Sequence, residues 1–246
     1  MIITTNQNSK LKNLRALYKD KKMRTTQGLF VAEGVNLVKD IDEKLTIKQL
    51  FIKESKYKNL SYLENKYGIE AFVVKDELFD AVCDTVTPSG VIAVLEKPIN
   101  KPIAGDIILL LDGIKDAGNM GTIIRSAAAK GIDSVVAINC TEVYSPKSVR
   151  ASMGGVFCVN CIETNSYEDA FNLISNYSIV SLDMGGKCIY GYKRVNKIAI
   201  AVGNEAHGIS KEIYSKSDEI ISIPMSKNIE SLNAAVSISI AMFLIQ

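Results

Sequence analysis

Residues 107–131 read IILLLDGIKDAGNMGTIIRSAAAKG, and this stretch decides the class of fold. Its five uncharged aliphatic residues are typical of a strand that is buried in a parallel sheet. A glycine-rich polar turn follows, and a helix is predicted to begin near Asn119. Ligands of open α/β sheets bind at such strand ends. The turn is therefore the first candidate functional site.

Further apolar, β-branched runs extend this pattern to the end of the chain. They lie at residues 135–138, 156–162, 178–182, 198–202 and 220–223. Helical patterns separate most of them, and parallel strands need such crossovers. We therefore predict an α/β domain with a largely parallel sheet over residues 107–246.

A composition change near residue 100 divides the chain. The segment EKPINKPIAGD at residues 96–106 contains two of the five prolines. It interrupts the apolar pattern of its flanks, as a linker does. We place one domain at residues 1–98, a linker at 99–106 and a second domain at 107–246.

The first domain is predicted to be a small α/β module. Its periodicity predicts helices over residues 8–23, 33–41, 55–67 and 76–84, and strands over residues 48–53, 71–75 and 90–95.

Charge is distributed unevenly between the two halves. The whole chain is 47% hydrophobic with a formal charge of +2, so a sizeable core is expected and disorder is not. Residues 1–105 carry a net +4 and residues 106–246 a net −2, with seven basic residues and one acidic residue among the first 24. A basic module of this kind often binds a phosphate backbone, although a solvated helix face is an alternative.

The apolar stretches and the cysteines of the chain predict its cellular compartment and whether it binds a metal ion. The first residues have no apolar run behind their charges, and no stretch is long enough to span a bilayer, so we predict a soluble, cytoplasmic protein without a membrane partner. Five cysteines are an odd number, which argues against a disulfide framework. Cys158 and Cys161 have no second pair or nearby histidine, so we expect a buried strand there and no metal site.

Basic side chains near the turns are candidate anion ligands. Arg125 lies on an otherwise apolar, small-residue helix face and needs an anion or a carboxylate partner. Lys147 and Arg150 lie three residues apart on a short helical stretch, which suits either phosphate contact or a solvated face. The glycines around Gly118 fit neither the dinucleotide fingerprint nor the P-loop, so an ordinary nucleotide site is disfavoured.

Two later segments place polar residues after buried strands. Residues 198–210, IAIAVGNEAHGIS, put Glu205 and the only histidine, His207, behind an apolar run. Residues 220–246 pass through Pro224 to Ser231 and Asn233 at the start of a final helix. Ser231 as a helix N-cap is the simpler interpretation of that residue. A lone histidine makes no catalytic triad, so we leave His207 out of the chemistry.

Together these motifs resemble the SpoU (TrmH-type) branch of the SPOUT superfamily, the S-adenosylmethionine-dependent RNA ribose 2′-O-methyltransferases. Residues 111–131 resemble the first family motif, GNEAHG at 203–208 the second, and the IPM and ESLN segments between 223 and 233 the third. PKSVRASMG at 146–154 also resembles the family. Residues 1–97 are similar to a substrate-binding domain that resembles small ribosomal RNA-binding proteins.

The resemblance implies a fold and roles for particular residues. The second domain would form a parallel-sheet methyltransferase domain with a C-terminal trefoil knot around the cofactor pocket, an exception to the rule that chains avoid knots. The implied catalytic residues are Asn119, Arg125, Glu205, Ser231 and Asn233. The implied S-adenosylmethionine ligands are Val202, Gly203, Asn204, Ile223, Met225 and Leu232. The expected RNA-binding residues are Lys10, Lys12, Arg15, Lys22, Arg24, Lys147 and Arg150.

The expected activity is 2′-O-methylation of ribosomal RNA by a homodimer with its active site near the subunit interface. Ribosomal RNA is favoured on domain analogy alone. A transfer-RNA ribose methyltransferase and a non-catalytic RNA-binding or ribosome-assembly protein on the same fold are the alternatives. Because an arginine is very hard to deprotonate, we expect Arg125 to stabilise negative charge while another group or water takes the proton.

Overall fold

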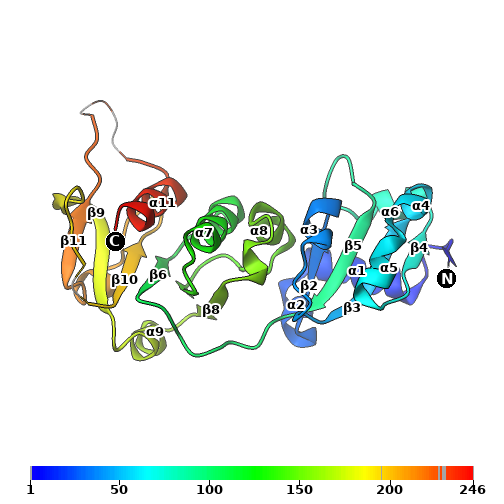
Figure 1. Ribbon diagram of the computed structural model, residues 1–246, viewed down its shortest axis with the longest axis horizontal. Helices are drawn as coiled ribbons and strands as arrows, with labels where there is room; N and C mark the ends of the chain where they lie inside the picture. Colours follow the sequence, from blue (N-terminus) through cyan, green and yellow to red (C-terminus); the bar gives the residue numbers. More distant parts are fainter. Residues whose placement is uncertain (1, 195, 227, 229–230, 246) are drawn as a thin grey trace.

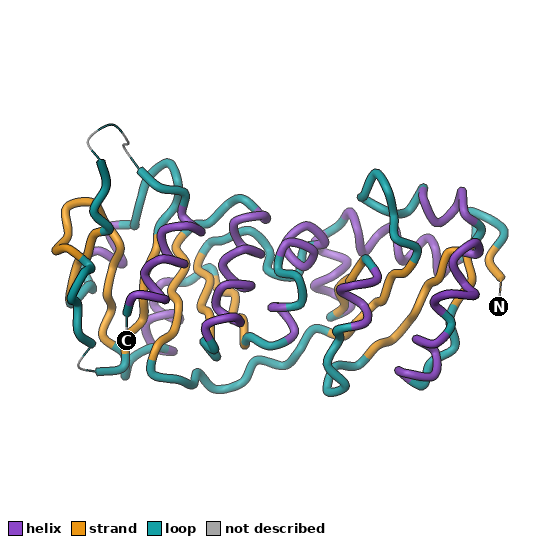
Figure 2. The backbone as a smooth tube through the Cα atoms, turned by 45° about the horizontal axis from the view of Figure 1, so that its top comes forward, coloured by secondary structure: helices purple, strands orange, loops and turns teal. Residues whose placement is uncertain are grey.

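The computed structural model describes residues 2–194, 196–226, 228 and 231–245. Two α/β units lie end to end along the long axis of the molecule, with the N-terminal unit at the right of Figure 1 and the C-terminal unit at the left. The strands of each unit lie side by side in its own sheet (Figure 2).

The N-terminal unit is built on a mixed five-stranded sheet. The strand order is β1-β4-β3-β5-β2, in which β5 is antiparallel to both of its neighbours. Its elements are β1 (Ile2–Ile3), α1 (Ser9–Lys19), α2 (Lys21–Gln27), β2 (Leu29–Glu33), α3 (Val35–Lys39), β3 (Ile47–Lys53), a 3₁₀ turn η1 (Glu54–Lys56), α4 (Tyr57–Leu60), α5 (Tyr62–Tyr67), β4 (Phe72–Val74), α6 (Asp76–Asp80) and β5 (Val91–Glu96).

Several boundaries in this unit differ from the sequence prediction. The helix predicted over residues 8–23 breaks at Asp20, whose extended backbone ends α1 and whose carboxylate accepts the Lys22 N–H at 2.7 Å to cap α2. Gly28, at φ +63°, ends α2 and leads into β2, a strand that the periodicity did not predict. The helix predicted over 55–67 is divided into η1, α4 and α5.

The C-terminal unit has a six-stranded sheet in which every described pairing is parallel, in the order β11-β9-β10-β6-β7-β8. This confirms the predicted α/β domain with a parallel sheet. Its elements are β6 (Ile107–Asp112), α7 (Ala117–Lys130), β7 (Ser134–Ile138), α8 (Pro146–Ala151), a 3₁₀ turn η2 (Gly155–Phe157), β8 (Asn160–Thr164), α9 (Tyr167–Leu173), β9 (Ser178–Cys188), β10 (Ile198–Val202), α10 (Lys211–Tyr214), β11 (Glu219–Ser222) and α11 (Ala234–Leu244).

Alternate residues of the central strands point into two separate cores. Leu109 and Leu111 of β6 pack with side chains of α7, α8 and α11. Ile108 and Leu110 of the same strand pack with side chains of α9 and α10 on the other face. Because successive side chains of a strand alternate between faces, an apolar run without interruption is what a sheet covered on both sides requires.

The strand predicted over residues 156–162 is shorter than expected. Gly154 has φ +92°, and η2 occupies the first part of this segment before β8 begins at Asn160. Cys158 is consequently exposed, and only Cys161 is buried in the strand. Among the described residues, no three His, Cys, Asp or Glu side chains come together in a way that could hold a metal ion.

The two units share one continuous apolar core. Phe30 of β2 lies against Tyr144 and Phe157 of the C-terminal unit, with ring centroids 5.0 and 6.4 Å apart. Beside these rings, the Arg24 guanidinium meets the Glu142 carboxylate at 2.6 Å, and both side chains are buried. The N-terminal unit is therefore packed firmly against the C-terminal one.

This ion pair corrects one sequence prediction. Arg24 was expected to bind RNA, but it is 5% exposed and its donors are occupied. It donates to both Glu142 oxygens and to the main-chain carbonyls of Leu17 and Tyr18. Arg24 therefore serves the interface between the two units.

No helix in the described part of the chain combines the length and the apolar character that a membrane crossing needs.

Candidate active site

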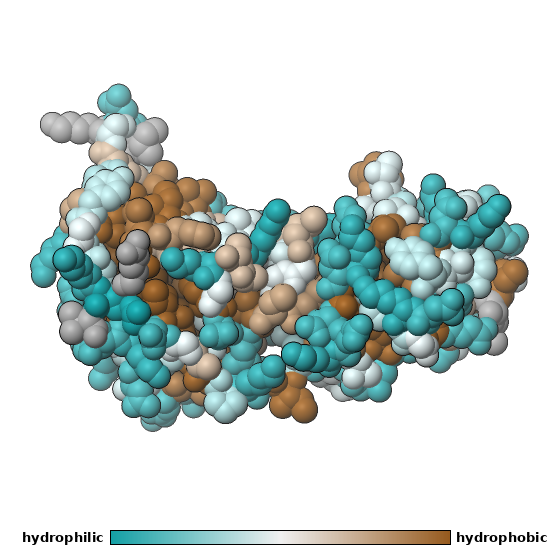
Figure 3. Space-filling model, in the orientation of Figure 1, coloured by the Kyte–Doolittle hydropathy of each residue, from teal (hydrophilic) through white to brown (hydrophobic). Residues whose placement is uncertain are grey.

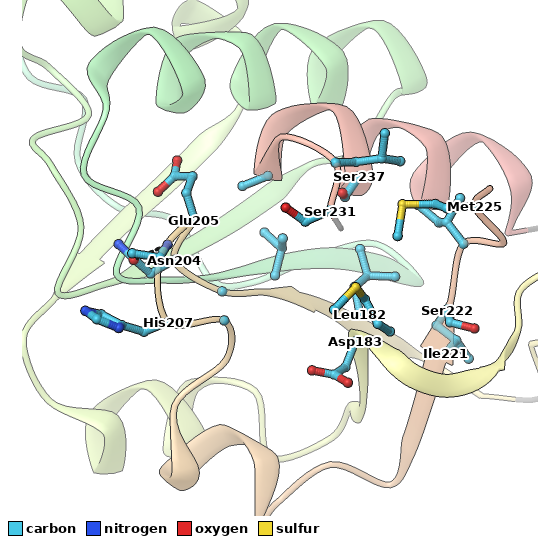
Figure 4. Close-up of a pocket in the computed structure, with 18 residues that line it drawn as sticks. Leu182, Asp183, Asn204, Glu205, His207, Ile221, Ser222, Met225, Ser231 and Ser237 are labelled. Carbon is cyan, nitrogen blue, oxygen red and sulfur yellow. Dashed lines mark hydrogen bonds between the residues drawn. The ribbon is translucent and has the colours of Figure 1, made fainter. Parts of the chain in front are cut away.

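A pocket of about 370 Å³ opens beside the middle of β9 and the ends of β10 and β11 (Figure 4). Three chain segments line it. They are the middle of β9, the turn after β10, and the stretch from the end of β11 into α11. Its lining residues are Leu182, Asp183, Met184, Val202, Gly203, Asn204, Glu205, Ala206, His207, Gly208, Ile221, Ser222, Ile223, Met225, Ser231, Leu232, Ala234 and Ser237.

The structure brings eight of the eleven expected catalytic and cofactor-binding residues to this one place. All six expected cofactor ligands, from Val202 to Leu232, line the pocket, together with Glu205 and Ser231. In Figure 4, Leu182, Ile221 and Met225 lie on the same side of the cavity as Asp183 and Ser222, whereas Glu205 and Asn204 lie at the opposite end. The pocket thus has one polar end and one end where apolar side chains lie beside a carboxylate and a hydroxyl.

Gly203 allows the turn after β10 to close on itself. A Cβ atom at this position would lie 2.1 Å from the carbonyl carbon and oxygen of Gly208 and 2.3 Å from the Ile209 nitrogen. The Asn204 and Gly208 main chains exchange hydrogen bonds at 2.9 and 2.8 Å. The close approach that glycine permits here is to the chain's own backbone.

The Asn204 side chain joins this turn to the first motif. Its amide Nδ2 donates to the Gly113 carbonyl at 2.8 Å, and its Oδ1 accepts the Ala206 N–H at 2.8 Å. The half-buried side-chain amide of Asn204 therefore holds together the turns that follow β6 and β10. This bond explains why the first and second motifs meet although 91 residues separate them.

A hydrogen-bonded chain connects three of the five expected catalytic residues. The Asn119 Nδ2 donates to Glu205 Oε1 at 2.5 Å, and the Asn233 Nδ2 donates to Asn119 Oδ1 at 3.0 Å. Asn233 Oδ1 accepts the Ala235 and Val236 N–H groups and so caps α11. The helix cap is therefore Asn233 and not Ser231, which leaves the Ser231 hydroxyl facing the pocket.

Asp116 fixes the start of the helix that carries Asn119. Its Oδ1 accepts the Asn119 N–H at 2.9 Å, and its Oδ2 receives the Lys147 ammonium at 2.9 Å. The bond from Lys147 and the bond from the Asn119 main chain hold the pKa of Asp116 below its ordinary value. A carboxylate that stays ionised at a helix N-terminus stabilises that terminus.

Arg125 lies apart from the hydrogen-bonded chain. It is exposed on α7 and does not line the pocket. Among the described residues it has no hydrogen-bond or ion-pair partner, so the carboxylate that could have neutralised it is absent from this part of the structure. No described residue occupies its guanidinium, so an external anion could bind there.

The pocket wall contributed by β9 was not among the residues predicted from the sequence. Leu182, Asp183 and Met184 line the pocket, but the predicted strand stopped at residue 182. In the structure β9 runs to Cys188 through two glycines, and a Cβ at Gly186 would lie 2.6 Å from the Ile221 backbone of β11. The signal in the sequence was the SLDMGG segment, which continues an apolar run with small residues. His207 also lines the pocket, although its ring points away from Ser231 and Met225 in Figure 4.

Comparison with known proteins decides the family. The SpoU rRNA methylase family matches residues 106–243, and the MRM3-like substrate-binding domain matches residues 8–93. This chain belongs to the SpoU rRNA methylase family. Membership in the SpoU family confirms the resemblance seen in the sequence motifs and the α/β class of both domains.

Relatives of known sequence and structure resemble this SpoU-family chain along nearly its whole length. It is 30% identical to the 23S rRNA (guanosine(2553)-2′-O)-methyltransferase of Bacillus subtilis, over 98% of this chain and 97% of the relative. A crystal structure of an AdoMet-bound rRNA methyltransferase from Sinorhizobium meliloti has a TM-score of 0.86 and 26% identity, covering 99% of this chain and 96% of that one. The AdoMet complex of the SpoU methyltransferase AviRb from Streptomyces viridochromogenes also has a TM-score of 0.86, with 25% identity over 96% of this chain and 97% of that one.

Proposed function

We propose that this protein transfers the methyl group of S-adenosylmethionine to a ribose 2′-hydroxyl in ribosomal RNA. The main support is that one pocket is lined by all six expected cofactor ligands. Glu205, which also lines this pocket, is hydrogen-bonded to Asn119, which in turn accepts a hydrogen bond from Asn233. The Bacillus subtilis relative is named as a 23S rRNA 2′-O-methyltransferase and the Sinorhizobium meliloti one as an rRNA methyltransferase, and the two domains match a methylase family and a substrate-binding family.

The residues present fit S-adenosylmethionine. A volume of about 370 Å³ lies in the range that small-molecule sites occupy. Apolar side chains such as Met225 and Leu232 suit an adenine ring, and the Asp183 carboxylate suits a ligand that carries positive charge. When bound, the cofactor supplies an activated methyl group on a positively charged sulfur.

The protein's own part in the reaction is to orient the ribose and to stabilise charge. The ribose 2′-hydroxyl is a weak nucleophile that gains negative charge as its proton leaves. We assign Arg125 to this oxygen and the adjacent phosphate, because a planar guanidinium donates two parallel hydrogen bonds and keeps its proton. Water or another group takes the hydroxyl proton. Asn119, Glu205, Ser231 and Asn233 hold the reacting groups in place.

A domain assignment completes the proposal. Residues 1–98 would bind the RNA, residues 99–106 would link, and residues 107–246 would catalyse. Lys10, Lys12 and Lys22 are exposed on α1 and α2, and Arg15 is half-buried with a hydrogen bond to Asn6 at 2.6 Å. These side chains are the proposed phosphate contacts. A cytoplasmic location follows from the proposed substrate.

Lys147 and Arg150 are less available for contact with RNA than the sequence suggested. Lys147 pairs with Asp116, and the Arg150 Nη1 lies 3.9 Å from a Glu33 oxygen. We keep Lys147 and Arg150 in the proposed RNA surface as secondary contacts. The trefoil knot remains part of the proposal, supported by the likeness of the fold to SpoU structures.

The experiment that tests the function is transfer of radiolabelled methyl from S-adenosylmethionine to total RNA of a strain that lacks this protein. The expected result is label in large-subunit ribosomal RNA, recovered as a 2′-O-methyl nucleoside after digestion. The Asn119→Ala variant is the control: it should bind S-adenosylmethionine but transfer little methyl, because Asn119 belongs to the proposed catalytic residues and does not line the cofactor pocket. Label in transfer RNA would overturn the substrate assignment. Cofactor and RNA binding without label would favour a non-catalytic RNA-binding protein.

Replacing Gly203 with alanine should weaken cofactor binding. The added Cβ would overlap the Gly208 backbone, so the turn that lines the pocket must open. Overpacking of this kind costs about 1–3 kcal/mol, which corresponds to an increase of roughly 5- to 150-fold in the Kd for S-adenosylmethionine. Calorimetric titration with S-adenosylmethionine measures this Kd. Gly185→Ala is the matched control, since its Cβ would meet only the Asp183 side chain, at 3.4 Å. An unchanged Kd in Gly203→Ala would contradict the assignment.

We also propose a homodimer that forms through α11. Its exposed apolar side chains are Val236, Phe243 and Leu244, and Figure 3 shows hydrophobic residues gathered over this helix. Contiguous exposed apolar side chains mark interaction sites. Phe243→Glu is expected to shift the sedimentation coefficient from that of a dimer to that of a monomer. A wild-type protein that sediments as a monomer at micromolar concentration would contradict this proposal.

A further inference from the structure

Met153 occupies an unusual place between α8 and η2. Its φ is +46°, in the left-handed region, and its side chain is 51% exposed. A bulky residue rarely adopts this backbone conformation, which glycine adopts without strain. A turn that served only to connect two helical segments would be more stable with glycine at this position. The methionine side chain therefore calls for an explanation.

The turn that carries Met153 is held against α7 beside Arg125. A Cβ at Gly121 would lie 2.5 Å from the Ala151 Cβ, so α8 packs on α7 without a gap. A Cβ at Gly155 would lie 3.0 Å from the Arg125 Cα, so η2 packs directly on the backbone of that arginine. The Met153 N–H donates to the Arg150 carbonyl at 3.2 Å. Met153 is thus presented on a turn that packs against the backbone of the helix that carries Arg125.

The same turn also lies at the junction of the two domains. Phe157, at the end of η2, packs against Phe30 of the N-terminal sheet. An RNA that is held by the N-terminal domain and reacts near Arg125 must cross this junction. An exposed apolar side chain on that path is in position to meet an unstacked base.

We propose that Met153 contacts a nucleobase of the substrate RNA close to the reacting ribose, and so positions that ribose at Arg125. This inference rests on the proposed function. A thioether is polarisable and packs favourably on aromatic rings. Proteins that bind RNA loops read unstacked bases by packing flat side chains, aromatic rings or guanidinium planes, on the base face, and an exposed thioether can pack on the same face. Met153 is accordingly a positioning residue.

Oxidation of methionine by hydrogen peroxide tests the contact directly. Met153 and Met184 are both exposed, at 51% and 66%, so both should be converted to the sulfoxide in the free protein. The protein is then mixed with deproteinised large-subunit ribosomal RNA from a strain that lacks it. We expect the bound RNA to abolish oxidation of Met153. S-adenosylmethionine alone should protect Met184, which lines the pocket, and leave Met153 reactive. Mass spectrometry of the peptides measures both sites in one sample.

The outcomes separate this inference from the proposed function. Continued oxidation of Met153 in a sample whose RNA is bound and methylated would overturn the contact and leave the function intact. RNA that is neither bound nor methylated would overturn both. Protection of Met153 in the absence of RNA, at protein concentrations where a dimer forms, would show that a second copy of this chain covers it.

Substitutions at the same residue distinguish contact from structure. Met153→Gly should keep or raise Tm because glycine relieves the backbone strain. The loss of the side chain should nevertheless raise the KM for RNA by about tenfold, with little change in kcat. Met153→Leu should restore most of the affinity. A Met153→Gly protein whose KM stays within twofold of wild type would overturn the inference.

Discussion

Replacing Arg125 with alanine is expected to lower the rate of methyl transfer by roughly 10²–10⁴-fold, the range for removing one group that acts on the reacting atoms. The guanidinium is exposed and has no hydrogen bond or ion pair to any residue that the structure describes, so its removal leaves no buried carboxylate unpaired. Folding should therefore be unaffected. Single-turnover methylation of ribosomal RNA measures the rate, and titration with S-adenosylmethionine should show an unchanged Kd.

The Arg125→Lys variant tests why an arginine is needed. Lysine keeps the charge but loses the planar pair of donors, so we expect only a small part of the activity to return. Thr122→Ala is the matched control, because Thr122 is the exposed residue one turn earlier on α7. A near-normal rate with an unchanged pH profile in Arg125→Lys would contradict the bidentate role.

Replacing Arg24 with alanine is expected to lower the free energy of unfolding by about 3–5 kcal/mol, the cost of leaving a buried charge without its partner. Glu142 would keep only Lys97, whose ammonium lies 3.3 Å from its carboxylate. The main-chain carbonyls of Leu17 and Tyr18 would also lose a donor. Urea denaturation measures the change.

The exposed pair of Lys147 and Asp116 supplies the control for Arg24. Both of these side chains are at least half exposed, so Lys147→Ala should cost less than about 1 kcal/mol. A cost for Arg24→Ala no greater than that for Lys147→Ala would show that the buried pair contributes little to the interface.

The same pair predicts a dependence of stability on pH. Burial alone would raise the pKa of Glu142, but the hydrogen bonds and charges of Arg24 and Lys97 lower it below its ordinary value. A lowered pKa in the folded state stabilises the protein above the ordinary glutamate pKa of about 4.3, and this stabilisation is lost as the pH falls through the folded value. In Glu142→Gln the decline in stability toward acid pH should be shallower than in wild type.

The local sequence was sufficient for the central strands of the C-terminal sheet. Runs such as residues 107–111 and 198–202 are too apolar for any position except a sheet covered on both faces, and the structure has them there. The motif residues around the pocket could also be named in advance, because their types and spacing resemble a known family. Local signals were weaker in the N-terminal unit, where Asp20 ends one helix and caps the next within a single polar segment.

The pocket wall from β9 and the interface arginine could not be predicted for a different reason. Leu182 and Asp183 line the pocket only because β9 continues beside β11, a pairing between segments more than 30 residues apart. Arg24 lies in a basic segment that has the composition of an RNA-binding surface, yet its partner Glu142 is 118 residues away. No sequence pattern near Arg24 predicts that Glu142 is its partner.

By itself, then, the sequence determined the class of fold, the family and the set of residues that could serve the reaction, because side-chain type and periodicity act over a few residues. Only the tertiary structure decided which of those residues meet. It placed Asn119, Glu205 and Asn233 in one hydrogen-bonded chain, buried Arg24, and left Arg125 exposed with no partner among the residues that the structure describes. Burial and ion pairing depend on contacts between distant segments: the hydrogen-bonded chain forms only when the C-terminal domain has folded, and the Arg24–Glu142 pair only when the two domains have packed.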